Sequence, residues 1–202
     1  MKKVFIIAFL AFFGMTQAQV TFKPGLRGGI NFSHISKGNN YDNNYYYYDN
    51  NGNYVNGNRP DFKSKTDFYI GFYGAVRLSK YYTLQPELDY SRQGAIYKRS
   101  GFADERLDIS YLSLAVINKF TFTEKFNIHI GPTIDFVVDN NFDTENDVDL
   151  TFYLGAGYNF TKNFGIEARV KKGIVPVVEQ YNDGYNTNVV FSFGATYSFD
   201  LK

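Results

Sequence analysis

The chain of 202 residues is long enough for one domain or two small ones. Its 21 Lys and Arg residues nearly balance 20 Asp and Glu residues, which excludes the net basic charge expected of a nucleic-acid-binding protein. Cysteine is absent, which excludes disulfides, thiolate metal sites and the lipidated cysteine of a bacterial lipoprotein. The aromatic content of 19% consists of Phe and Tyr alone, and together with frequent Gly it favours an all-β protein.

Residues 1–18 have the layout of a cleavable secretory signal peptide. Lys2 and Lys3 precede an unbroken apolar run over 4–13, and small residues at Thr16 and Ala18 mark a cleavage site before Gln19. The alternative is a membrane anchor, but the run is shorter than the ~20 residues that a spanning helix needs, and no later segment approaches that length. We therefore expect an exported protein with a signal peptide over 1–18 and one domain over 19–202.

Eight later segments show the period-two alternation of β-strands. The clearest is Phe126–Val138, in which Ile128, Ile130 and Ile134 alternate with polar or small residues. A strand of that length spans about 43 Å, which suits a path tilted by about 45° through a hydrocarbon core about 30 Å thick. The other predicted strands cover residues 20–33, 66–78, 82–97, 107–122, 148–160, 164–174 and 188–201.

The connections between these strands alternate between short turns and longer loops. The longest, His34–Lys65, is rich in Tyr, Asn and Asp, has almost no aliphatic residues and shows no period, which indicates a loop. Short turns at one end and longer loops at the other predict an up-and-down meander with its N-terminus at the short-turn end. The predicted fold is all-β, an eight-stranded antiparallel transmembrane β-barrel preceded by a cleavable signal peptide.

The polar faces of the predicted strands carry charges of both signs, while the opposite faces are stacks of Phe, Ile, Leu and Val. A membrane barrel places the apolar face in lipid and the charges inside, where the interior of eight strands is only wide enough for side chains. Buried charges require partners, so near balance predicts mutual pairing; the alternative is a proton or ion path. The predicted interior charge network comprises Arg27, Arg77, Glu87, Asp89, Lys119, Asp135, Glu167, Arg169 and Lys171.

Three prolines interrupt the predicted strands at Pro24, Pro86 and Pro132. Proline has no backbone N–H and cannot donate to a strand ladder. We expect local bulges or gaps in the ladder at these positions.

Two further features could carry catalysis or bind a metal. His129 on the interior face, and His34 beside Ser33, raise the possibility of acyl-chain chemistry, and the acidic loop Asp143–Asp149 offers oxygen ligands without the spacing of an EF-hand. A core histidine and a solvated loop explain these residues more simply. We therefore predict no catalytic residue, no cofactor and no metal.

The most distinctive surface feature is a run of four tyrosines inside the longest loop. Tyrosines offer flat amphipathic contact area and hydroxyl groups to carbohydrate or protein. The alternative is a low-complexity loop without a partner. The candidate surface-binding loop comprises Tyr45, Tyr46, Tyr47, Tyr48 and Tyr54.

An ordered set of short motifs resembles the PorT-like outer-membrane β-barrel family of Bacteroidota-type bacteria. The matching pieces are Gly25–Ser33 (G-L-R-G-G-I-N-F-S), Gln85–Gly94 (Q-P-E-L-D-Y-S-R-Q-G), Tyr111–Phe120 (Y-L-S-L-A-V-I-N-K-F), Ile130–Pro132, Gly155–Tyr158 and Glu167–Arg169. The family's usual proline in the fourth strand is Ala115 here, and a common aromatic residue after the last motif is Val170. The resemblance implies an eight-stranded outer-membrane barrel; its named member serves a protein-secretion system.

The expectation from the sequence is therefore a non-enzymatic, monomeric outer-membrane barrel that presents extracellular loops for structural or surface-interaction roles. Its expected partners are outer-membrane lipid and, as candidates, envelope proteins or surface glycans, with no nucleic acid. The alternative is an accessory component of an envelope protein-secretion machine, and a narrow channel is a weaker third interpretation.

Overall fold

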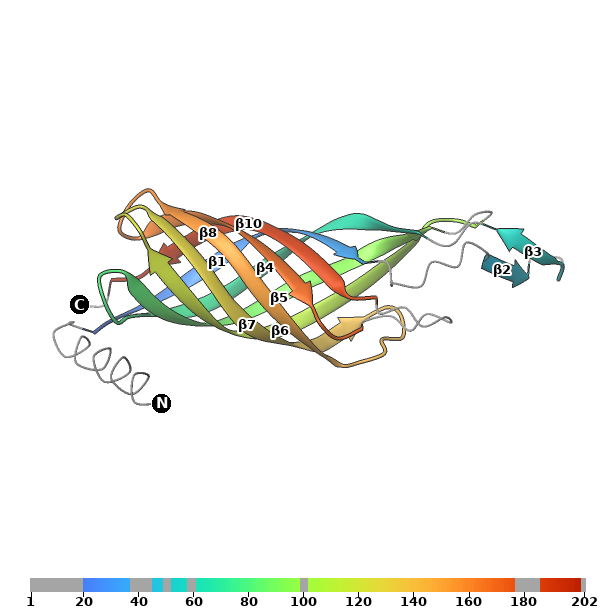
Figure 1. Ribbon diagram of the computed structural model, residues 1–202, viewed down its shortest axis with the longest axis horizontal. Helices are drawn as coiled ribbons and strands as arrows, with labels where there is room; N and C mark the ends of the chain where they lie inside the picture. Colours follow the sequence, from blue (N-terminus) through green and yellow to red (C-terminus); the bar gives the residue numbers. More distant parts are fainter. Residues whose placement is uncertain are drawn as a thin grey trace, which may run out of the picture.

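The computed structural model describes residues 20–36, 45–48, 52–57, 61–98, 102–176 and 186–200. Eight strands form one closed antiparallel barrel with the neighbour order β1-β10-β9-β8-β7-β6-β5-β4, and β4 pairs with β1 (Figure 1). This confirms the predicted eight-stranded meander. The barrel strands are β1 (Thr21–Ile35), β4 (Asp61–Arg77), β5 (Tyr82–Lys98), β6 (Glu105–Thr121), β7 (Phe126–Asn140), β8 (Val148–Asn159), β9 (Phe164–Gly173) and β10 (Asn188–Ser198). Among the described residues, no helix has the length and apolarity to cross a membrane.

The two ends of the barrel differ, as predicted. At the short-turn end, where β1 begins and β10 ends, three tight connections repeat one arrangement (Figure 1). The hydroxyl oxygens of Ser79, Thr123 and Thr161 each accept a hydrogen bond from the backbone N–H three residues later, at 3.1, 2.9 and 2.9 Å. Such hydroxyl turns compensate locally for the backbone bonds that a reversing chain loses. The longer connections lie at the opposite, long-loop end.

The outer face of the barrel is an apolar belt. Along β6 the outward side chains run from Leu112 to Phe122, which lies one residue past the end of the strand, and these ten residue steps span about 24 Å of height at a tilt of about 45°. That height matches the ~25 Å apolar band of outer-membrane barrels. At the short-turn end the belt finishes in aromatic pairs with ring centroids 5.2–6.2 Å apart: Tyr82–Phe120, Phe122–Phe126, Tyr158–Phe160, Phe160–Phe164 and Tyr197–Phe199.

The ladder is interrupted at the prolines without a change of register. Between β4 and β5 the partners pass from Tyr73 and Glu87 to Val76 and Leu84, which leaves a gap opposite Pro86. A similar gap between β6 and β7 faces Pro132, and the β1–β10 ladder starts just after Pro24. Gaps therefore occur where the sequence predicted gaps or bulges, because a missing N–H removes one bond and leaves the strand spacing unchanged.

The register shifts lie elsewhere, at two positions that the sequence analysis did not mark. One separates Ser64 from Tyr69 in the β4–β5 ladder, and the other separates Ser110 from Tyr111 in the β6–β7 ladder. Gly94 lies opposite the first shift with a φ of 134°, a conformation that residues with a side chain rarely adopt. An extra residue in one strand moves the following side chains to the other face.

Two predictions about the first long connection are corrected by the structure. The expected loop His34–Lys65 is shorter, because β1 continues to Ile35 and β4 starts at Asp61, and it contains a separate two-stranded sheet, β2 (Tyr45–Tyr48) and β3 (Tyr54–Gly57). The hairpin could not be predicted from an aliphatic period, since tyrosine has high strand propensity without adding one.

The interior of the barrel is also not polar throughout: at the long-loop end, four buried apolar side chains pack together, Ile35, Phe62, Ala95 and Leu107.

Candidate functional site

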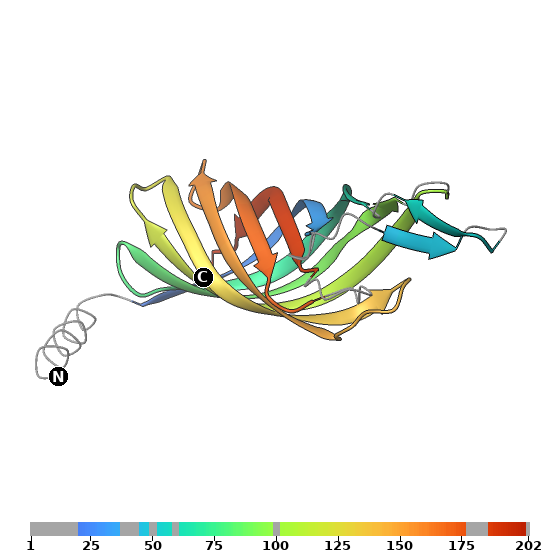
Figure 2. The same ribbon diagram turned by 45° about the vertical axis from the view of Figure 1, so that its right-hand side comes forward.

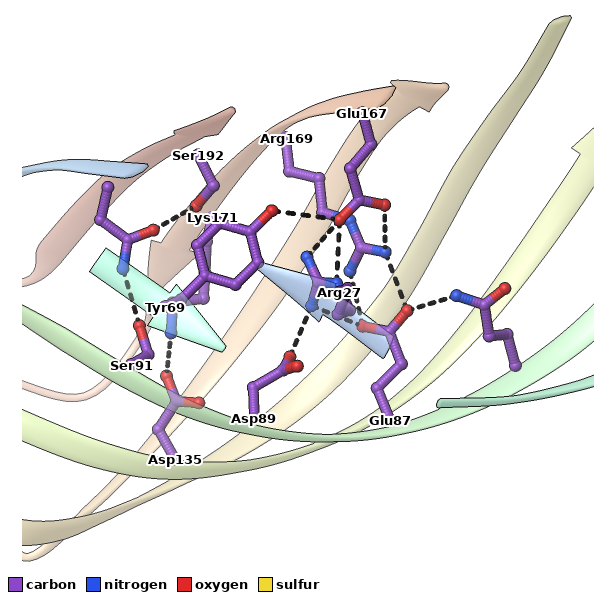
Figure 3. Close-up of polar contacts among 12 residues, drawn as sticks. Arg27, Tyr69, Glu87, Asp89, Ser91, Asp135, Glu167, Arg169, Lys171 and Ser192 are labelled. Carbon is purple, nitrogen blue, oxygen red and sulfur yellow. Dashed lines mark hydrogen bonds and ion pairs between the residues drawn. The ribbon is translucent and has the colours of Figure 1, made fainter. Parts of the chain in front are cut away.

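Five buried charged side chains form one network across the middle of the barrel, here called the central network (Figure 3). Arg27 of β1 contacts three carboxylates: Nη1 lies 2.9 Å from Glu87 Oε2 and 2.5 Å from Asp89 Oδ2, and Nη2 lies 2.6 Å from Glu167 Oε1. Arg169 of β9 donates to both oxygens of Glu87, at 2.6 and 2.8 Å, and to Glu167 Oε2 at 2.9 Å. The two guanidinium groups thus share two of the carboxylates.

The central network joins opposite walls of the barrel. Strands β5 and β9 lie four positions apart in the ring of eight, so the paired side chains of Glu87 and Arg169 meet across the whole lumen. Every side chain in the network is at most 3% exposed. Two guanidinium groups face three carboxylates, and charges of opposite sign are in contact throughout. The arrangement fills the interior with paired side chains, as an eight-stranded barrel requires.

Neutral side chains complete the central network. The hydroxyl of Tyr69 donates to Glu167 Oε1 at 3.3 Å, its ring lies 4.7 Å from the Arg27 guanidinium, and the amide of Gln85 donates to Glu87 Oε1 at 2.7 Å. Tyr69 and Gln85 were not among the predicted site residues, because they carry no charge; their place on the inward faces of β4 and β5 was the available signal. Gly71 makes room here, since a Cβ at that position would collide with the carboxylate of Asp89.

A separate buried ion pair lies nearer the long-loop end. The ammonium of Lys171 on β9 is 2.5 Å from Asp135 Oδ2 on β7, and both side chains are at most 2% exposed. The ammonium also lies 5.7 Å from the ring centroid of Tyr111 and 5.6 Å from that of Tyr153. Aromatic faces attract a cation, so this lysine is held by one carboxylate and two rings.

Two residues predicted for the interior network lie outside it. Arg77 is exposed at the short-turn end, where its guanidinium donates to the carbonyl oxygens of Ser79 and Lys80, at 3.2 Å each. Lys119 is half-buried on the inward face of β6, and within the described part of the chain it has no ion pair within 4.0 Å. The strand period gives the face of each residue but not its height along the barrel, and these two lie nearest the short-turn end.

The structure gives the two histidines no catalytic arrangement. His129 is fully buried on β7, and its Nδ1 lies 3.3 Å from Asn127 Oδ1, which leaves it without a serine or carboxylate partner among the described residues. His34 follows Ser33 on β1, so the two side chains point to opposite faces of the strand. The acidic segment 143–149 is described throughout, and no group of three His, Cys, Asp or Glu side chains in the described residues is arranged to hold a metal ion.

The candidate tyrosines belong to a hairpin, β2–β3, and not to an irregular loop. The hairpin projects beyond the long-loop end of the barrel (Figure 2). Tyr45, Tyr46, Tyr47 and Tyr48 form the whole of β2, and their backbone partners in β3 are, in that order, Gly57, Asn56, Val55 and Tyr54. The predicted loop conformation is therefore wrong for Tyr45–Tyr48 and for Tyr54, because all five residues lie in paired strands.

The side chains of this hairpin are described at its turn. The rings of Tyr48 and Tyr54 are 5.4 Å apart, and these residues are 70% and 65% exposed. The side chains of Tyr45, Tyr46 and Tyr47 lie outside the described part of the structure, so their predicted role in binding stays a prediction. The hairpin therefore presents at least one pair of contacting tyrosine rings to solvent.

Comparisons with known proteins agree with this geometry. Residues 17–179 match the model of the family described as outer membrane protein beta-barrel domain. No curated protein matches the sequence significantly.

Solved structures with the same fold include three outer-membrane or surface proteins. OprG of Pseudomonas aeruginosa is 13% identical, with a TM-score of 0.50, over 92% of this chain and 99% of that one. Ail of Yersinia pestis, in complex with the heparin analogue sucrose octasulfate, is 14% identical, with a TM-score of 0.50, over 88% and 99%. Neisserial surface protein A is 13% identical, with a TM-score of 0.55, over 87% and 97%. At these identities the likeness concerns the fold alone.

Proposed function

Because this chain belongs to the family of outer membrane protein beta-barrel domains, we propose that it is a non-enzymatic, monomeric barrel that presents its long loops outside the cell for structural or surface-interaction roles. In such barrels short turns face the periplasm and longer loops face outward, so the long-loop end is the extracellular end. Export by a signal peptide over 1–18, with the barrel domain over 19–202, is part of this proposal, since residues 1–18 lie outside the described part of the chain.

The observation that carries the proposal is the central network between opposite walls. Glu87 and Arg169 close the lumen with a buried, bidentate ion pair, which argues against a channel and against a substrate site inside the barrel. Function is then left to the surfaces outside the lumen. The most distinctive of these is the β2–β3 hairpin, whose Tyr48 and Tyr54 rings are exposed together.

The proposed ligands of the hairpin are surface glycans or proteins. Tyrosine rings supply rigid amphipathic contact area at a low cost in conformational entropy, and their hydroxyls bond to sugars and to peptide groups. The similar barrel Ail has been solved with a sulfated sugar, the heparin analogue sucrose octasulfate. That complex supports testing sulfated and unsulfated glycans first.

The test is a binding screen with the mature chain in lipid nanodiscs on arrays of glycans and extracellular-matrix proteins. One variant carries Ser in place of each tyrosine of Tyr45–Tyr48 and of Tyr54. A second variant, Tyr48→Ser with Tyr54→Ser, separates the exposed ring pair from Tyr45, Tyr46 and Tyr47. The matched control is Tyr81→Ser, because Tyr81 is also exposed, at 60%, but lies in a turn at the periplasmic end.

We expect reproducible binding by the wild type and by the Tyr81→Ser control, and its loss in the variant that lacks all five hairpin tyrosines. Loss in the Tyr48 and Tyr54 variant as well would assign binding to the exposed ring pair. Equal binding by all four proteins, or no binding above empty nanodiscs, would refute the surface-interaction role.

A second candidate function rests on the finer family resemblance. The ordered motifs from Gly25–Ser33 to Glu167–Arg169 resemble PorT-like barrels, and on that ground we propose, as the alternative, an accessory component of an envelope secretion machine. Cross-linking in cells followed by purification of the tagged chain distinguishes the two functions. A reproducible envelope partner in stoichiometric yield favours the machine component, and recovery of the barrel alone excludes it.

A further inference from the structure

A second ionic cluster lies on the wall of β4, β5 and β6 above the apolar belt, here called the rim cluster: Lys65, Asp67, Arg92, Arg106 and Asp108. Arg106 Nε lies 3.0 Å from Asp108 Oδ1, and Arg106 Nη2 lies 3.8 Å from Asp67 Oδ2. Arg92 Nε lies 3.6 Å from Asp67 Oδ1. Lys65 contacts both acids, with its ammonium 2.8 Å from Asp67 Oδ2. The cluster carries three cationic and two anionic groups.

The two arginines are the most exposed members of the rim cluster. The side chains of Arg106 and Arg92 are 59% and 35% exposed, whereas those of Lys65 and Asp67 are only 2% and 6% exposed, and that of Asp108 is 29% exposed. Asp67 therefore contacts both guanidinium groups from the buried side, whereas Asp108 lies beside Arg106 on the same face of β6. What the cluster presents outward is two oriented guanidinium groups with further N–H donors.

The strand alternation places these guanidinium groups on the outer wall. Arg106 follows the exposed Glu105 and precedes Leu107, which is buried inside the barrel, so Arg106 points outward. The Arg92 guanidinium lies 6.0 Å from the ring of Phe68, which is 46% exposed and belongs to the outer face. Both arginines thus face the membrane side of the barrel and not its lumen.

The rim cluster lies directly above the upper edge of the belt. Arg92 pairs with Ser110 on β6, two residues beyond Leu112, the last outward apolar side chain of that strand. Two residues along a strand tilted by about 45° add roughly 5 Å of height, which is the depth of a headgroup region. Just below, the rings of Phe68 and Tyr90 lie 6.2 Å apart. Cationic donors therefore stand immediately above an apolar and aromatic surface.

We propose that the rim cluster binds the phosphate group of an anionic lipid in the outer leaflet, with its acyl chains against the Phe68 and Tyr90 rings. Guanidinium groups match the geometry of phosphate oxygens and are the preferred partners of this anion in proteins. Because Asp67 and Asp108 already restrain the guanidinium groups of Arg92 and Arg106, these side chains lose less conformational entropy when they bind a phosphate. We assign the phosphate to a lipid and not to a free ion, because the apolar surface beside the cluster can contact acyl chains, which a free phosphate ion lacks. This inference requires only the outer-membrane location and is independent of the hairpin's proposed role.

The test measures affinity for lipid A in detergent micelles, with the mature full-length chain and by a titration of labelled protein. The bisphosphorylated lipid is compared with its fully dephosphorylated form. The binding variant is Arg92→Gln with Arg106→Gln. The matched control is Arg77→Gln, an exposed arginine at the periplasmic end. Folding is checked in each variant by the shift in gel mobility that a closed barrel shows on heating. Arg106→Gln alone keeps the test available if the double variant does not fold, since that side chain is 59% exposed.

We expect the double variant and the dephosphorylated lipid each to weaken binding by at least about tenfold, the loss that one or two charge-assisted hydrogen bonds produce. Arg106→Gln alone should weaken it severalfold, and Arg77→Gln should leave it unchanged. Equal affinity of wild type and variants would overturn the assignment of the site. Complete displacement of the lipid by millimolar inorganic phosphate would overturn the lipid as its ligand and leave a site for free anions.

Discussion

Replacing Arg169 with methionine removes the central network's link between opposite walls of the barrel. Arg169 is fully buried and makes three charge-assisted hydrogen bonds, two to Glu87 and one to Glu167. Removing one partner of a buried ion pair costs about 3–5 kcal/mol, because the remaining charge stays buried without compensation. Methionine keeps much of the side-chain volume, so little of this cost comes from a cavity. We expect Arg169→Met to lower the free energy of unfolding by about 3–5 kcal/mol.

The assay is reversible guanidinium unfolding of the refolded barrel in detergent, followed by far-ultraviolet circular dichroism and by gel mobility. Arg77→Met is the control, since exposed arginines outside any network usually contribute within ~0.5 kcal/mol. Glu87→Gln completes a double-mutant cycle, in which the double variant should lose about 1–3 kcal/mol less than the sum of the single losses. Equal unfolding free energies for Arg169→Met and Arg77→Met, or strict additivity in the cycle, would refute the network as the stabilising feature.

Two further predictions concern the belt and the periplasmic end. Leu154→Arg, at an outward position in the middle of β8, should lower the free energy of unfolding in lipid bilayers by about 2–4 kcal/mol. Ile174→Arg, at the extracellular end, should lower it by only about 0–1 kcal/mol. Similar losses at both positions would contradict the placement of the belt. Hydrogen bonds from Lys23 and Asn163 lower the pKa of the Asp200 carboxyl group, so its contribution is present above the unfolded pKa of about 3.9 and is lost as pH falls through the lower folded value. The guanidinium concentration at the midpoint of unfolding should therefore differ between wild type and Lys23→Gln at neutral pH and become equal below about pH 3. A difference that grows on acidification would contradict a stabilising ion pair between Lys23 and Asp200.

Much of the fold follows from local pattern. The alternation in Phe126–Val138 predicted a long strand with one apolar face, and β7 covers that segment and two more residues. The short turns at Ser79, Thr123 and Thr161 were predicted because each separates two alternating runs. Alternation also gave the correct face for Arg27, Glu87 and Arg169, since side-chain direction in a strand depends only on parity.

The features that the sequence analysis missed are those that depend on neighbouring strands. The shift between Ser64 and Tyr69 is a property of the β4–β5 pairing and has no marker in β4 alone. It brings Phe62 inward at the extracellular end and lies beside Lys65 and Asp67, so the apolar end of the lumen and the rim cluster were both absent from the sequence analysis. The β2–β3 hairpin was missed for another reason, because a strand made of Tyr45–Tyr48 needs no aliphatic period to pair.

The sequence by itself determined that the chain is a barrel with an apolar outer face and charges inside, because a period of two and the alternation of short and long connections are local properties. Only the closed structure decided which charges meet. Arg169 pairs with Glu87, 82 residues earlier, because ring order sets β9 opposite β5 and register sets both side chains at one height. The same register leaves Arg77 at the periplasmic end, outside the central network. Partner choice in a lumen is fixed by closure and register, and neither is written in any single strand.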